Sequence, residues 1–153
     1  MLSVGENSNH GSCHAILSFA GERLDPDDIA SLIAARVTKA RKKGDKLARP
    51  LAGHADPAAK VGYCEIATSG AILSNDINEH IAYLLSQVED NLGSIQSFVD
   101  RNNIAWRIVC FFEDENIADT WDLSHENANR AITIGIPIYS ENVEKLAAKP
   151  GLA

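Results

Sequence analysis

The sequence lacks the features that mark several large classes of protein. No apolar run approaches the roughly 18 residues of a membrane-spanning helix, and residues 1–12 contain no basic stretch followed by an apolar one. We therefore expect neither a membrane protein nor a secretory signal. The chain has only three cysteines, widely spaced, and two of them, Cys64 and Cys110, fall in apolar strand-like runs. This pattern predicts buried free thiols in a cytoplasmic protein, and neither a disulfide framework nor a zinc site.

Motifs for nucleotide, metal and nucleophile chemistry are also missing. The ten glycines form no G-x-G-x-x-G or G-x-x-x-x-G-K-[ST] loop, and the five histidines form no H-x-x-x-H or H-x-H pair. The run Ser124-His125-Glu126 is explained more simply as a helix cap and first turn than as part of a catalytic triad. The acidic stretch 113–122, expected to be a loop, fits no calcium-binding pattern. We expect no catalytic residues, metal or cofactor, and an enzyme with an unrecognised cleft stays an alternative.

The most distinctive feature present is a basic segment, residues 36–49. It holds seven of the 14 lysines and arginines with one acid, Asp45, and so carries a net charge of +6. The other seven basic and 20 acidic residues give −13, and the chain totals −7. Such a polarised chain could attract an anionic partner at one surface, although the segment could instead be a solvated connector. Its candidate contact residues are Arg36, Lys39, Arg41, Lys42, Lys43 and Lys46.

The length and pattern of the chain predict one domain. A chain of 153 residues can bury a sizeable core without dividing into two units. We expect a disordered polar tail at residues 1–12, a single domain at 13–146 and a frayed tail at 147–153.

Alternating apolar and polar residues, bounded by turn residues, predict four strands. The most apolar run should lie at the centre of a sheet. The run that contains Pro137 should lie at an edge, because proline has no N–H to give to a neighbouring strand. The strands span residues 14–20, 60–68, 104–112 (the most apolar) and 136–139.

Capping residues and apolar stripes predict four helices. The first begins with Pro26 and keeps its apolar face as far as Val37. The predicted helix caps are Asp25, Asp76 and Ser124, and the third helix is expected to follow Asn91. The last helix should end at Gly135 and bury Ala128, Ala131 and Ile132.

The order of these elements predicts the fold class. Two strand–helix–strand units, which resemble those of ferredoxin-like folds, are separated by an intervening pair of helices. We expect a single α+β domain with a mostly antiparallel four-stranded sheet and helices packed on it. The order of the strands in the sheet cannot be read from the sequence.

Several features in order make residues 14–140 similar to a known family. They are the opening strand, the helix start Leu24–Ile29, Thr38 before Gly44-Asp45, the Leu84-Leu85 helix, and the closing strand that follows Gly135 and ends at Tyr139. In these respects the chain resembles a bacterial family described as domain of unknown function 4279. The chain departs from that family where Ala35-Arg36-Val37-Thr38 replaces a Gly-x-x-Pro-Thr-like turn. The resemblance implies a small cytoplasmic α+β domain and implies no activity.

Two aromatic residues are candidate contacts outside the basic segment. Trp121 is flanked by acidic residues and Tyr139 ends the last strand, so both could lie exposed beside a cleft. Trp121 could equally cover the end of the sheet.

These observations favour a non-enzymatic binding domain. We expect it to recognise another protein through its polarised acidic and basic surface, as small immunity or regulatory proteins do. One alternative is the binding of nucleic acid or a phosphorylated ligand at 36–49. Another is a homodimer in which the acidic and basic regions meet.

Overall fold

The computed structural model describes residues 12–45, 60–140 and 143–146. The predicted tails, except for Ser12, lie outside these ranges, as do Lys46 and Arg49 of the basic segment. The elements are β1 (Cys13–Gly21), α1 (Pro26–Leu32), β2 (Lys39–Arg41), β3 (Gly62–Ala67), α2 (Ile77–Glu89), α3 (Leu92–Arg101), β4 (Ala105–Phe112), α4 (Glu115–Thr120), α5 (His125–Ile134), β5 (Ile138–Ser140) and β6 (Val143–Leu146).

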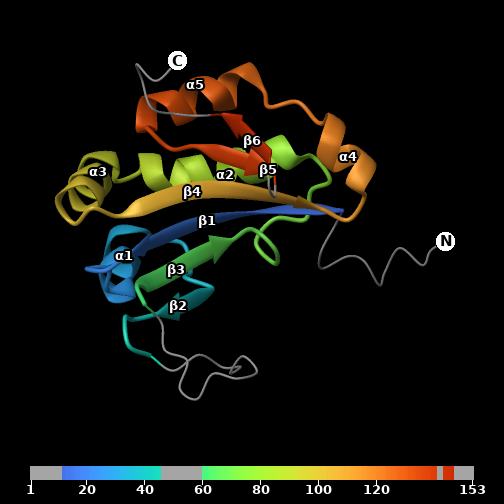
Figure 1. The fold of residues 1–153 in the computed structure, drawn as a ribbon. Coiled ribbons are helices and arrows are strands. Elements are labelled where there is room, and N and C mark those ends of the chain that lie inside the picture. The colour runs from blue at the N-terminus through green and yellow to red at the C-terminus, as the bar shows by residue number, and fades with distance from the viewer. Residues whose placement is uncertain (1–11, 46–59, 141–142, 147–153) are drawn as a thin grey trace.

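The strands form one six-stranded sheet in the order β2-β3-β1-β4-β5-β6 (Figure 1). All neighbouring pairs are antiparallel except β4 and β5, which are parallel. The predicted α+β class, with a mostly antiparallel sheet and helices packed on it, is confirmed. The four predicted strands correspond to β1, β3, β4 and β5, and the structure adds β2 inside the basic segment and β6 after β5.

The prediction that the Pro137 strand lies at an edge is wrong. β5 lies between β4 and β6. Pro137 precedes β5 and contributes its carbonyl, which accepts a hydrogen bond of 3.0 Å from the Ile108 N–H. The missing proline N–H therefore removes no bond from the β5 ladder.

The core lies between the helices and one face of the sheet. Along β1, the side chains that are buried in the core alternate with those on the other face, as a period of two requires. The sheet side of the core comes mainly from the three central strands, and α2 packs across β1. The core residues of β1 and β4 are Cys13, Ala15, Leu17, Phe19, Ile108 and Cys110.

Helix α1 ends earlier than predicted. It stops at Leu32, and Ile33 is already extended with φ −120° and ψ 129°. The side-chain amide of Asn91 donates to the Leu32 carbonyl at 3.1 Å, which satisfies an acceptor that a continuing helix would use. The chain therefore leaves α1 after Leu32 and reaches β2, at the edge of the sheet, at Lys39.

Helix α5 confirms the predicted cap and stop. The Ser124 hydroxyl accepts from the Asn127 N–H, and Gly135 ends the helix with a left-handed φ of 87°. Burial of Ile132 is wrong, because its side chain is 43% exposed. The inward stripe instead follows the i, i+4, i+7 positions Asn127, Ala131 and Ile134.

The acidic stretch 113–122 is only partly a loop. It contains α4, which begins after Asp114, and the carboxylate of Asp114 caps the helix by accepting from the Asn116 N–H at 2.9 Å. The sequence signal is a short capped turn that lacks the apolar stripe of a longer helix.

Candidate binding surface

The face of the sheet turned away from the core carries a set of partly exposed side chains that we call the open face. The described helices pack on the other side, so strand register alone brings these residues together (Figure 1). The first two rows across the sheet are Arg41–Tyr63–Ala20–Ala105 and Lys39–Glu65–Ser18–Arg107. The next two are Ala67–Ile16–Val109–Tyr139 and His14–Phe111.

Two arginines on the open face stack on tyrosine rings. The guanidinium carbon of Arg41 lies 5.0 Å from the ring centroid of Tyr63, and that of Arg107 lies 5.5 Å from the centroid of Tyr139. Both distances fall within the range of cation–π attraction. Neither arginine forms an ion pair with a described carboxylate. Each positive charge is therefore held against a ring and is not paired with a carboxylate of the described residues.

The phenol of Tyr63 is held by a hydrogen bond to a residue of its own strand, β3. Its hydroxyl donates to a carboxylate oxygen of Glu65 at 2.5 Å. Burial raises the pKa of Tyr63 well above its usual value, and the hydrogen bond to Glu65 and the negative charge of that carboxylate raise it further. Tyr63 therefore stays a neutral hydrogen-bond donor at physiological pH.

A hollow of about 540 Å³ opens at the middle of the open face. Its floor is formed by the central strand β1, where Ser18 is only 8% exposed, and its walls carry longer side chains from β3 and β4. It combines apolar, aromatic and charged groups within one small area. The lining residues are Ile16, Ser18, Tyr63, Glu65, Arg107, Val109 and Phe111.

The described part of the basic segment divides between two surfaces. Lys39 and Arg41 lie on β2 and belong to the open face. Lys42 lies 3.7 Å from the Asp25 carboxylate and Lys43 lies 3.2 Å from that of Glu22, both as exposed pairs. Arg36 is exposed and Lys46 lies outside the described residues. The described residues of the segment, 36–45, therefore do not form one basic patch, and nearby acids offset part of their charge.

The two predicted aromatic contacts do not form a cleft. Trp121 is only 8% exposed, and its ring packs on Phe112 with centroids 5.7 Å apart, so the prediction that it is exposed is wrong. It follows the last turn of α4 and covers the end of the sheet on the core side, as the alternative had it. Tyr139 lies on the opposite, open face beside Arg107.

Sequence reasoning missed most of the open face. It did not single out Arg107, Glu65, Phe111 or Ser18. One signal was available in the sequence, because Arg107 is the one charged residue in the apolar run 104–112. A charged residue within a central strand indicates that one face of that strand reaches solvent.

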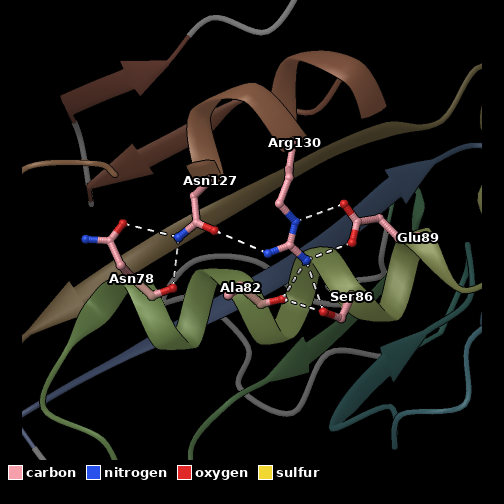
Figure 2. A network of polar contacts seen from close by, with 6 residues as sticks. All are labelled: Asn78, Ala82, Ser86, Glu89, Asn127 and Arg130. Carbon is pink, nitrogen blue, oxygen red and sulfur yellow. Dashed lines mark hydrogen bonds and ion pairs between the residues drawn. The ribbon is translucent and has the colours of Figure 1, made fainter. Parts of the chain in front are cut away.

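A second polar cluster joins α5 to α2 and is structural. Figure 2 shows Arg130 of α5 reaching across to Glu89, with Nη2 and Nε donating to the two carboxylate oxygens at 2.7 and 2.9 Å. Nη2 also donates to the Ser86 hydroxyl at 3.0 Å, and the Asn127 amide donates to the Asn78 carbonyl at 2.9 Å. The hydrogen bonds from Arg130 lower the pKa of Glu89. These contacts fix the two helices against each other.

Two features are missing from the described residues, a cluster of metal-binding side chains and a helix that could cross a membrane. Within residues 12–45, 60–140 and 143–146, no three His, Cys, Asp or Glu side chains converge closely enough to hold a metal ion. No helix in those ranges is both long enough and apolar enough to cross a bilayer.

Comparison with known proteins yields a family but no function. The family model described as Domain of unknown function (DUF4279) matches residues 11–140, which is most of the chain. No curated protein and no solved structure matches the chain.

Proposed function

We propose that this chain, which belongs to the family described as Domain of unknown function (DUF4279), is a non-enzymatic domain that binds another protein through its open face. The observation that carries the proposal is the pair of Arg–Tyr stacks on either side of the central hollow. Arginine and tyrosine are the residue types that most often dominate the energy of protein–protein interfaces.

The arrangement of the open face supports this proposal. Apolar and aromatic side chains of Ile16, Val109 and Phe111 lie around the hollow, and charged groups of Arg41 and Lys39 lie toward the β2 edge. An apolar centre with a polar rim is typical of protein interfaces. Cations held on rings lose less side-chain entropy when a partner binds, since their positions are already restricted.

Binding of nucleic acid at 36–49 is the alternative, and two observations weigh against it. The chain carries a net charge of −7, and Lys42 and Lys43 already contact the carboxylates of Asp25 and Glu22. A phosphate backbone would need several such cations at once. The open-face tyrosines also each carry an arginine over the ring, where a base would stack.

Affinity capture with matched variants tests the proposal. Tagged protein would be incubated with bacterial lysate with and without nuclease, as wild type and as the Arg41→Ser/Arg107→Ser double variant. The control is Arg101→Ser, which removes an exposed arginine from α3 on the other side of the sheet. A second control, Lys42→Ser/Lys43→Ser, removes equal charge beside the open face.

The proposal predicts a nuclease-resistant protein band that the open-face variant weakens by about tenfold or more, which is the size of a hot-spot effect. Both controls should retain it. Equal retention by all variants would contradict the proposal, and material that disappears with nuclease would favour the nucleic-acid alternative.

A further inference from the structure

The floor of the open-face hollow is a serine hydroxyl flanked by two opposite charges. Ser18 lies on the central strand, and its register partners are Glu65 on β3 and Arg107 on β4. Neighbouring strands are about 4.8 Å apart. Glu65 and Arg107 lie on the strands to either side of β1, so their backbones are about 10 Å apart across the hollow. They form no ion pair with each other in the described structure.

The charged groups on the two sides of the hollow, Glu65 and Arg107, differ in how many of their hydrogen-bonding groups already have a partner. Glu65 accepts the hydrogen bond of the Tyr63 hydroxyl and lies opposite Lys39 on the next strand. Arg107 has the ring of Tyr139 beneath its guanidinium, and none of its N–H groups donates to a described acceptor. A ring contact engages the flat face of a guanidinium and leaves the N–H donors at its edge available.

Ser18 is also left with hydrogen-bonding capacity. Its hydroxyl forms no hydrogen bond with another described group, although the residue is only 8% exposed. Ala20, the next open-face residue on β1, is small and leaves room above the floor. A ligand group that enters the hollow would therefore meet a hydroxyl below it and a guanidinium beside it.

We infer that the hollow receives a carboxylate side chain of the partner protein, from Asp or Glu, held by the guanidinium of Arg107 and the hydroxyl of Ser18. This inference rests on the proposed function and specifies the chemistry of the partner at one point. A guanidinium binds a single carboxylate through two parallel N–H bonds, which lysine cannot match.

The opposite wall selects against a more highly charged occupant. Glu65 repels negative charge, and a nucleic-acid strand would bring consecutive phosphates across the hollow toward it. A protein segment carries one acid side chain to Arg107, while its neighbouring apolar residues can lie over Ile16, Val109 and Phe111. An acidic segment with apolar neighbours is therefore the occupant that matches both walls.

The test uses a small probe, N-acetyl-aspartate N-methylamide, titrated into the full ¹⁵N-labelled chain and followed by NMR. The matched control probe is N-acetyl-asparagine N-methylamide, which has the same shape and no charge. The expected result is a saturable shift of the Arg107 side-chain Nε–H and the Ser18 amide with the acid alone. Arg107→Gln should weaken the affinity about tenfold or more, while Arg101→Gln should leave it unchanged. Ser18→Ala tests whether the Ser18 hydroxyl contributes to binding of the acid probe. The amide spectrum of each variant, outside the substituted site, should match that of the wild type and so verify its fold.

Three outcomes would overturn the inference. The first is an equal response to the acid and amide probes, and the second is an acid response that survives Arg107→Gln. The third is a ten-nucleotide oligo(dT) that shifts the same residues at lower concentration than the acid. If affinity capture still depends on Arg41 and Arg107 but the probe fails, the inference falls and the proposed function stands. If the probe binds at Arg107 but no captured protein depends on the open face, the proposed function falls, and the inference falls with it.

Discussion

The Nδ1 nitrogen of His80 lies 2.6 Å from the hydroxyl oxygen of Thr68, deep in the core. The Nε2 nitrogen of the same ring lies 2.7 Å from the Ser74 carbonyl, which can only accept, so Nε2 donates to it, and in a neutral ring Nδ1 accepts from the threonine. The Thr68 oxygen also accepts the Ala15 N–H at 2.9 Å. One hydroxyl thus links β1, the end of β3 and α2, and the role of His80 in this contact is structural.

Replacing Thr68 by valine should destabilise the fold by about 2–3 kcal/mol. The shape is nearly kept, but the Ala15 N–H and the His80 ring nitrogen lose their partner in a site closed to water. Urea unfolding monitored by circular dichroism would measure the change in the free energy of unfolding.

The matched control for Thr68 is Thr120→Val on α4. The Thr120 hydroxyl donates to the Asn116 carbonyl at 2.8 Å, but the residue is exposed, so water can replace the bond. This variant should change stability by no more than about 0.5 kcal/mol. Similar losses of unfolding free energy in Thr68→Val and Thr120→Val would show that the buried hydrogen bonds of Thr68 contribute no more than an exposed one.

Two glycines should respond to alanine in opposite ways. A Cβ added to Gly62 would collide with the backbone carbonyl oxygen of Leu24, which cannot turn aside as a flexible side chain could, so Gly62→Ala should cost about 1–3 kcal/mol. A Cβ added to Gly93 in α3 would enter open space, and Gly93→Ala should leave stability unchanged or raise it by up to about 1 kcal/mol. Thermal unfolding of both variants measures this, and a loss at Gly93 equal to that at Gly62 would contradict it.

The Glu89–Arg130 pair should make stability depend on pH in the acid range. Hydrogen bonds from Arg130 lower the pKa of Glu89 in the folded state below the value of about 4.3 expected in the unfolded chain. The unfolded chain therefore binds this proton first as pH falls. The stabilisation is complete above that unfolded value and is lost as pH falls through the lower folded pKa.

The wild type should therefore lose more unfolding free energy between pH 6 and about pH 3 than Glu89→Gln does. Glu79→Gln supplies the control, since Glu79 is exposed on the same helix and forms no ion pair with a described residue. Its pH profile should follow that of the wild type. If the free energy of unfolding of the wild type and of Glu89→Gln depended on pH in the same way, the Glu89–Arg130 pair would not contribute to the pH dependence.

The three thiols should be protected in the native protein. Cys13, Cys64 and Cys110 are all buried, and burial raises the pKa of Cys64 to about 12, with a further contribution from the charge of Glu65. Because the thiolate is the reactive form, a disulfide reagent such as DTNB at pH 8 should react slowly with the folded chain. All three should react at once in denaturant. Rapid stoichiometric reaction of a native thiol would contradict this.

The local parts of the fold could be predicted from sequence because their signals are local. Alternation along β1, the caps at Asp25 and Ser124, and the left-handed stop at Gly135 each depend on a few adjacent residues. Strand β2 was missed because three residues with two positive charges carry no strand pattern. Its formation depends instead on β3, 20 or more residues further along the chain.

The open face could not be assembled from sequence for the same reason. Arg107 meets Tyr139, and Arg41 meets Tyr63, only after strand order and register are fixed by pairings distant in the chain. The prediction that Trp121 is exposed failed for a different reason. The flanking acids indicate the polarity of the segment, but they do not indicate the direction in which one side chain points. Both failures concern the placement of side chains, although the strands that carry Tyr63, Arg107 and Tyr139 were predicted.

The central position of β1 has a consequence for the order in which the protein can fold. β1 precedes the other described elements, yet its final register joins Cys13 to Phe112 and Gly21 to Gly62. The pairing that closes the middle of the sheet must therefore wait until most of the chain is available, and it must overcome the entropy of closing a long loop. Until then the edge of β1 that will pair with β4 stays open even if β3 has already paired on the other side, which makes the interval before β4 docks the stage most exposed to misassociation.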